Sequence, residues 1–151
     1  MDSKTLQFDL RKGVKFHNGE KFDADDVVFT LNYLGDPANG AKPARNVNWW
    51  NNAEKLGEYK VQLNLKKEFP AALEFLSGPL VMYPNDYYSK NGPEGMALKP
   101  VGTGPYQVTS VEPGKRYKFK KYDGYHASSP KGQASIGNIV IRTIAESNTQ
   151  L

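Results

Sequence analysis

Apolar and polar residues alternate in two stretches of the chain, and each stretch predicts a strand with one buried face. Leu6, Phe8 and Leu10 alternate with polar residues near the N-terminus, and the same period of two runs through residues 59–65. Residues 52–56 end at a turn just before the second stretch. Residues 52–56 are therefore predicted to pair with residues 59–65 as neighbouring strands.

Between these stretches the apolar positions change to helical spacing, which predicts one amphipathic helix. Asp23 is the predicted N-cap, and Asp26 stands three residues later in the position of a capping box. Gly35 is expected to end the helix in a left-handed conformation, because Pro37 follows and prevents continuation. The apolar residues of the stripe are Val27, Val28, Leu31 and Leu34.

Glycine and proline divide the middle of the chain into short elements. A short helix is predicted to begin at Phe69-Pro70, since proline suits the first helical position, and to end at Gly78. A short strand is predicted over residues 80–83. Helical turns are expected to follow, with an interruption at the Asn-Gly-Pro sequence of residues 91–93.

The C-terminal third predicts a hairpin and one further strand. Strands over 106–111 and 116–122 are joined by Pro113-Gly114, a pair typical of a type II turn. Isoleucines spaced through residues 136–144 predict a last strand with both faces covered, and a helix is expected after it. Together the elements predict an α+β fold with a mixed, largely antiparallel sheet and short helices.

The composition restricts the classes of function. A formal charge of +4 and a pI of about 9.1 are mildly basic, but the only tight run of cations is Lys118, Lys120 and Lys121. The solvated face of a strand explains that run better than a nucleic-acid site does. The chain has no cysteine, which excludes disulfides, thiolate nucleophiles and zinc–thiolate sites. No apolar run has the length of a transmembrane helix.

No combination of residues predicts catalysis. The G-x-G sequence at 102–104 continues into Pro105 and lacks the lysine of a phosphate-binding loop. Clustered carboxylates at Asp23, Asp25 and Asp26 are better explained by capping and by the helix dipole than by a metal ion. The two histidines have no partners at the spacing of a metal site. We therefore predict a protein that is not an enzyme and that holds no metal and no cofactor.

The pair Trp49-Trp50, flanked by asparagines, is the strongest candidate for ligand contact. Adjacent residues of an extended chain point to opposite sides, so one indole can enter a core while the other faces a cleft. An indole offers a flat apolar face and one N–H donor to a ligand. In the alternative interpretation both rings pack in the core, and the sequence leaves the two interpretations open.

One ordered series of residues runs without a gap through the predicted strand, turn and helix: Phe8, Leu10, Arg11, Gly13, Val14, Lys15, Phe16, His17, Gly19, Phe22, Ala24, Asp26, Val27, Val28, Phe29 and Thr30. This series resembles the large substrate-binding proteins of ABC importers (bacterial extracellular solute-binding proteins, family 5), which carry peptides, nickel chelates and related solutes. Residues 100–106 resemble the family's crossing from its accessory subdomain to the ligand-binding lobe. Residues 122–126 depart from the family, because they lack its Asn-Pro and its Trp.

The resemblance implies part of a periplasmic-binding-protein-like fold with two lobes. Residues 1–101 would form part of the accessory subdomain of the first lobe, and residues 102–151 would supply strands of its main ligand-binding portion. The implied function is that of the substrate-binding component of an ABC transporter that imports peptides or a related small solute. The implied partners are the solute and a membrane permease, without nucleic acid.

The implied location is the periplasm, although residues 1–4 lack the basic-then-apolar layout of a signal peptide. Taken literally, such a start predicts a cytosolic product. Taken with the resemblance, we expect a piece of an exported protein that begins at an artificial methionine.

The resemblance also bears on ligand contact. In the family, the loop after this helix supplies an aromatic residue to the ligand cleft, which points to Trp49 or Trp50 without deciding between them. Asn48 and Tyr83 are the further candidates for contact.

A second interpretation is an independent small binding module for a carbohydrate or for single-stranded nucleic acid, based on the paired tryptophans and the basic strand. Strongly salt-dependent binding to oligonucleotides would favour it. Under the first interpretation, the Phe8 strand and the last strand are expected to pair with elements outside this chain. The isolated chain is then expected to cover these edges, for example by dimerising.

Overall fold

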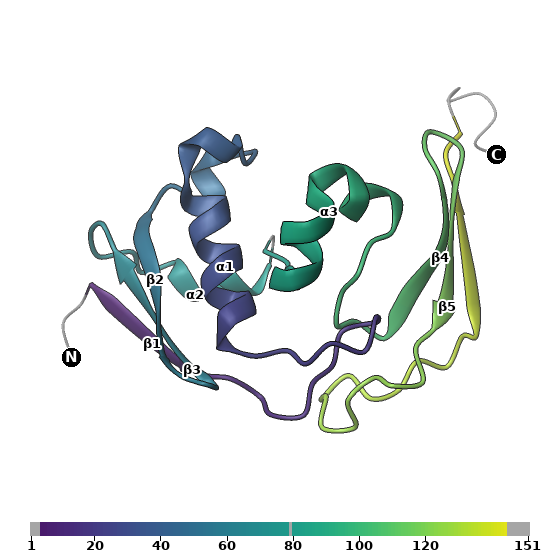
Figure 1. Ribbon diagram of the computed structural model, residues 1–151, viewed down its shortest axis with the longest axis horizontal. Helices are drawn as coiled ribbons and strands as arrows, with labels where there is room; N and C mark the ends of the chain where they lie inside the picture. Colours follow the sequence, from purple (N-terminus) through teal and green to yellow (C-terminus); the bar gives the residue numbers. More distant parts are fainter. Residues whose placement is uncertain (1–3, 79, 145–151) are drawn as a thin grey trace. The chain divides into compact units, whose positions relative to one another are not determined.

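The computed structural model describes residues 4–78 and 80–144. The chain divides into two compact units, each with its own three-stranded sheet (Figure 1). Unit 1 holds residues 1–13 and 22–85, and unit 2 holds residues 14–21 and 86–151. The short helices and the antiparallel strand pairs confirm the predicted α+β fold.

Unit 1 contains a sheet of order β1-β3-β2 and a helix that packs on it. β2 (Trp50–Gly57) and β3 (Lys60–Leu65) pair as predicted. β1 (Thr5–Asp9) pairs with β3 and places Phe8 opposite Val61. The expectation that the Phe8 strand pairs outside this chain was therefore wrong for one of its two edges, because β3 occupies it.

Helix α1 (Ala24–Gly35) begins with the predicted capping box. The Asp23 carboxylate accepts the Asp25 N–H at 2.9 Å, and the Asp26 carboxylate accepts the Asp23 N–H at 2.9 Å. The prediction for its C-terminus was wrong, because Gly35 is the last helical residue and has no positive φ. Asp36, with φ −79°, ends the helix instead.

A close approach between α1 and the start of β2 explains why residue 35 is glycine. The Trp50 side chain is 1 % exposed, and its Nε1–H donates to the Leu31 carbonyl at 3.0 Å. A Cβ on Gly35 would lie 2.5 Å from Trp50 Nε1. The missing side chain lets the indole lie against the last turn of the helix.

Residues 80–84 contain no strand, so the strand predicted there was wrong. Side chains of α1 hold this segment instead. The Tyr83 N–H donates to Thr30 Oγ1 at 2.9 Å, and the Asn85 N–H donates to Asp26 Oδ1 at 2.8 Å. These hydrogen bonds satisfy the N–H groups of Tyr83 and Asn85, so this segment needs no neighbouring strand to accept them. Before this segment, α2 (Ala72–Ser77) begins two residues later than the predicted proline start.

Unit 2 contains the predicted hairpin and the last strand, in the order β4-β5-β6. β4 (Tyr106–Glu112) and β5 (Arg116–Lys121) are joined through Gly114, whose φ of +71° agrees with a type II turn. α3 (Asn85–Leu98) is interrupted at Gly92, as predicted. β6 (Asn138–Arg142) completes the sheet.

The buried residues of unit 2 lie outside its sheet. His17 joins the loop of residues 102–104, since its Nε2–H donates to the Gly104 carbonyl at 2.9 Å and its Nδ1 accepts the Gly102 N–H at 3.3 Å. Tyr122 donates its hydroxyl hydrogen to the Phe16 carbonyl at 3.1 Å. No residue of β4, β5 or β6 is fully buried. The expectation that both faces of the last strand are covered was therefore wrong for the described residues.

The helix expected after the last strand falls in residues 145–151, which lie outside the described residues. None of the described helices is long and apolar enough to cross a membrane.

We predict that Gly35→Ala destabilises the protein. The new methyl group would meet Trp50 Nε1 at 2.5 Å, and the buried ring has little room to move. The expected loss in the free energy of unfolding is about 1–3 kcal/mol, measured by urea titration with tryptophan fluorescence. The control is Gly57→Ala, where the nearest atom, Lys60 Cβ, lies 3.9 Å away. Equal stability of the two variants would contradict the prediction.

We also predict that Thr30→Val destabilises the protein although it keeps the shape of the side chain. The change leaves the Tyr83 N–H without its acceptor at a position where Thr30 is 0 % exposed. An unsatisfied buried donor costs about 1–3 kcal/mol, which thermal and urea unfolding would detect. Thr109→Val removes a hydroxyl from an exposed bond to the Lys118 carbonyl and should have almost no effect. The prediction fails if both changes are neutral.

Candidate functional site

The loop between α1 and β2 is built from two single turns of 3-10 helix. η1 (Pro37–Asn39) begins at Asp36, whose carboxylate accepts the Ala38 N–H at 2.9 Å. Asn39 donates from Nδ2 to the Tyr33 carbonyl at 2.9 Å. η2 (Ala44–Asn46) follows. Local side-chain bonds therefore give this Pro- and Asn-rich loop a defined shape.

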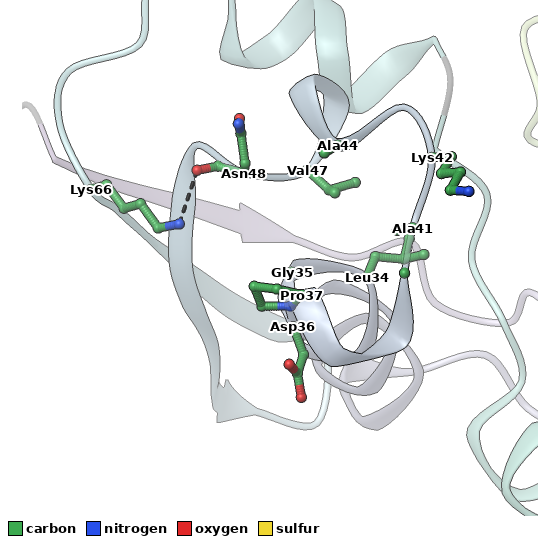
Figure 2. A pocket seen from close by; sticks show the side chains of 11 residues that line it. Leu34, Gly35, Asp36, Pro37, Ala41, Lys42, Ala44, Val47, Asn48 and Lys66 are labelled. Carbon is green, nitrogen blue, oxygen red and sulfur yellow. Dashed lines mark hydrogen bonds between the residues drawn. The ribbon is translucent and has the colours of Figure 1, made fainter.

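A hollow of about 280 Å³ lies between this loop, the end of α1 and Lys66, the residue after β3 (Figure 2). Its wall is largely apolar, and its polar side chains are those of Asp36, Lys42, Asn48 and Lys66. The apolar lining comes from Leu34, Pro37, Ala41, Ala44 and Val47. A mostly apolar wall with a few polar groups is the usual composition of a small-molecule site.

A second hollow of about 210 Å³ is lined by part of the same loop and by residues 80–83. It shares Leu34, Ala41, Lys42 and Val47 with the first hollow. Its remaining lining residues are Pro43, Asn46, Leu80, Val81 and Tyr83. Of the predicted candidates, Asn48 lines the first and Tyr83 the second of these two hollows, which we call the loop hollows.

The structure places both predicted tryptophans in the core of unit 1. Trp49 is 6 % exposed, and its Nε1–H donates to the Asn46 carbonyl at 2.9 Å. Its ring lies 4.7 Å from the ring of Phe69 and meets Trp50 edge-on at 4.8 Å. Both indole N–H groups are thus bonded to backbone carbonyls, and neither ring lines a loop hollow. Ligand contact by either ring stays a prediction.

Asn48 is the exposed member of the Asn-Trp-Trp series. Its carbonyl accepts a hydrogen bond from Lys66 Nζ at 2.9 Å, drawn as the dashed line in Figure 2. This bond uses only the backbone of Asn48. Asn48 lines the first hollow, and its side-chain amide, which points away from Leu34 and Pro37 in Figure 2, can both donate and accept hydrogen bonds.

Tyr83 is half-buried, and its backbone N–H and carbonyl both bond to the Thr30 hydroxyl, at 2.9 and 3.4 Å. Burial, with a smaller contribution from Tyr33, raises the pKa of the Tyr83 hydroxyl above its ordinary value. Tyr83 is one of the residues that line the second hollow.

The clustered acidic side chains of unit 1 have structural roles. No group of three or more metal-ligating side chains occurs among residues 4–78 and 80–144. The clustered carboxylates act in structure: Asp23 and Asp26 cap α1, and Asp25 forms an exposed ion pair with Lys55 at 2.7 Å. The loop hollows offer mostly apolar surface to a solute, and their polar residues include both cations and the Asp36 carboxylate.

Sequence reasoning missed Lys42, Lys66 and the small apolar residues that line the hollows. Leu34 was interpreted only as part of the helix stripe, and Lys66 lies beyond the end of β3. Nothing in their spacing marks these residues, because contacts such as the one between Lys66 and Asn48, which are 18 residues apart in the chain, form only when the chain folds.

Comparison with known proteins agrees with the resemblance seen in the sequence. The model of the bacterial extracellular solute-binding proteins, family 5 (middle part), matches residues 1–151. A glutathione-binding protein, GsiB of Escherichia coli, is 32% identical over 153 residues, covering 99% of this chain and 28% of that protein. This chain therefore spans less than a third of the length of that relative.

Solved structures show the same fold. A structure of NikZ from Campylobacter jejuni in complex with Ni(L-His) matches with a TM-score of 0.83 and 27% identity, over 95% of this chain and 28% of that one. A structure of AgaA from A. tumefaciens in complex with agropinic acid matches with a TM-score of 0.86 and 28% identity, over 98% and 29%.

These relatives are binding proteins, which agrees with the prediction that the chain is not an enzyme. The family consists of extracellular proteins, which agrees with the prediction that the protein is exported. Because the family model matches the chain from its first residue to its last, the chain belongs to the bacterial extracellular solute-binding proteins of family 5.

Proposed function

We propose that the chain forms part of the substrate-binding component of an ABC importer, and that this component captures a peptide or a related small solute in the periplasm. The observation that supports this function best is the family match over residues 1–151. The named relatives bind small solutes: glutathione, a nickel–histidine chelate and agropinic acid. A membrane permease is the proposed partner that receives the solute.

The proposal assigns residues 1–101 to an accessory subdomain and 102–151 to strands of the ligand-binding lobe. A cleft between two lobes can bury a solute only when both lobes are present. This chain corresponds to 28% of the glutathione-binding relative, so most of such a cleft would come from residues outside it. The comparisons give no support to an independent carbohydrate or nucleic-acid module.

Within the chain we propose that the loop hollows contribute to solute contact. Asn48 lines the first hollow, and Tyr83 lines the second. Trp49 and Trp50 lie directly behind this loop, where their packing on Phe69 and α1 would hold its shape. A direct stacking role for either ring would need a rearrangement that exposes it.

We predict that the chain by itself binds short peptides weakly or not at all. The physical reason is the incomplete cleft, which leaves a bound solute largely in water. Isothermal titration calorimetry with a pool of short peptides would measure the affinity. The comparison is the longer gene product, which should co-purify with a small solute that mass spectrometry can identify. Micromolar binding by the 151-residue chain would contradict the prediction.

We further predict that Asn48→Ala in the longer gene product weakens binding of the co-purified solute by about tenfold, the effect of losing one or two hydrogen bonds. The melting temperature should not change, since the Lys66 bond uses only the Asn48 backbone. Asn51→Ala is the matched control, because Asn51 is an exposed asparagine on β2 that lines neither hollow. Equal affinities of the two variants would remove Asn48 from the site.

A further inference from the structure

Lys42 is the one charged residue among the described residues that line the second loop hollow. Two further polar residues of its wall, Asn46 and Tyr83, carry no formal charge. The rest of the wall is apolar and consists of Leu34, Ala41, Pro43, Val47, Leu80 and Val81. The second hollow therefore combines apolar surface with one positive charge.

The first loop hollow differs, because its charges are of both signs and two of them are already engaged. The Asp36 carboxylate accepts a backbone N–H of η1 at 2.9 Å, and the Lys66 ammonium donates to the Asn48 carbonyl at 2.9 Å. Figure 2 shows Lys42 well apart from Asn48 and Lys66. Among the described residues, the Lys42 ammonium has no hydrogen-bond or ion-pair partner. It is therefore available to a group that enters the second hollow.

We propose that the second hollow is a subsite for an apolar group that carries a carboxylate, with the carboxylate paired to the Lys42 ammonium and the apolar group against Leu80 and Val81. This inference rests on the proposed function, because it takes the loop hollows as part of the solute-binding surface. It adds the chemical class of the group that is bound there. The hollow of about 210 Å³ is smaller than the pockets of about 300–1,000 Å³ that enclose whole small molecules, so it takes one end of a solute.

Desolvation is the physical reason that an anion suits this hollow better than a neutral group. Lys42 is exposed in this structure, so water solvates its ammonium. A solute that fills the hollow removes part of this water, and a cation that loses water without gaining an opposite charge costs free energy. A carboxylate replaces the lost hydration with a charge-assisted hydrogen bond, whereas a neutral amide is a weaker acceptor and an amine is repelled.

The apolar part of the subsite is formed before a solute arrives. Val81 is 59 % exposed, and Leu80 is only partly buried against the core of unit 1. The backbone after them is fixed, because the Tyr83 N–H and carbonyl both bond to the Thr30 hydroxyl. Covering this surface with an aliphatic group removes it from water, and a surface that needs little ordering loses little free energy on binding.

A matched pair of small probes tests the subsite in the chain itself. 4-Methylpentanoate carries a branched apolar group and a carboxylate, and 4-methylpentanamide has nearly the same shape without the charge. In NMR titrations both should move the backbone amide signals of Lys42 and Val81, and the acid should bind about two- to fivefold more tightly, as for a partly exposed ion pair. Equal affinities of the two probes, or no shift at these residues with the acid, would overturn the proposal.

Three variants of the chain test whether Lys42 causes this preference. Lys42→Met removes the charge and should bind the acid and the amide equally, whereas Lys42→Arg keeps the charge and should keep the preference. Lys67→Met is the matched control, because Lys67 is an exposed lysine that lines neither loop hollow. It should leave the preference unchanged. A Lys42→Met variant that still prefers the acid as strongly as the wild type does would overturn the proposal.

The same variants in the longer gene product separate this inference from the proposed function. With the hollow covered, Lys42→Met should weaken binding of the co-purified solute by about tenfold or more, and Lys67→Met should leave it unchanged. Equal affinities of these two variants would overturn the inference and leave the proposed function in place. A longer gene product that captures no peptide or related solute would overturn the proposed function, whereas the preference of the hollow for the acid is decided by the NMR titrations alone.

Discussion

The contact between the Trp50 indole and the last turn of α1 is the interaction on which unit 1 depends. It joins the helix to the first residue of β2, and it closes the ends of the loop between them. The indole N–H donates a hydrogen bond to the Leu31 carbonyl, and the absence of a side chain at Gly35 makes room for the ring. The loop hollows exist because this closure holds the intervening residues in a defined path.

Two buried polar residues of α1 extend this organisation to the next part of the chain. Asp26 caps its own helix and also holds the N–H of Asn85, while Thr30 holds both backbone groups of Tyr83. One helix thus positions both Tyr83 and, through Trp50, the end of the loop. Unit 2 differs, because among the described residues none of β4, β5 or β6 is fully buried.

Most elements follow from local patterns in the sequence. The period of two located β1 and β3, the capping box located the start of α1, and Asn-Gly-Pro located the interruption of α3 at Gly92. These features depend on residues close in the chain, so a local pattern is sufficient. The strand predicted at residues 80–83 was wrong because an apolar run cannot reveal that Thr30 will supply its hydrogen bonds.

The sequence by itself therefore determined the family, the fold class and the turn and cap residues, because each depends on short-range order that folding does not change. Only the tertiary structure decided the role of Gly35, the burial of both tryptophans and the residues that line the loop hollows. Alternation along the chain suggested that Trp49 and Trp50 point apart, but the loop and α2 region cover both faces with apolar partners. Burial is a property of what packs from elsewhere in the chain, and a local pattern does not contain it.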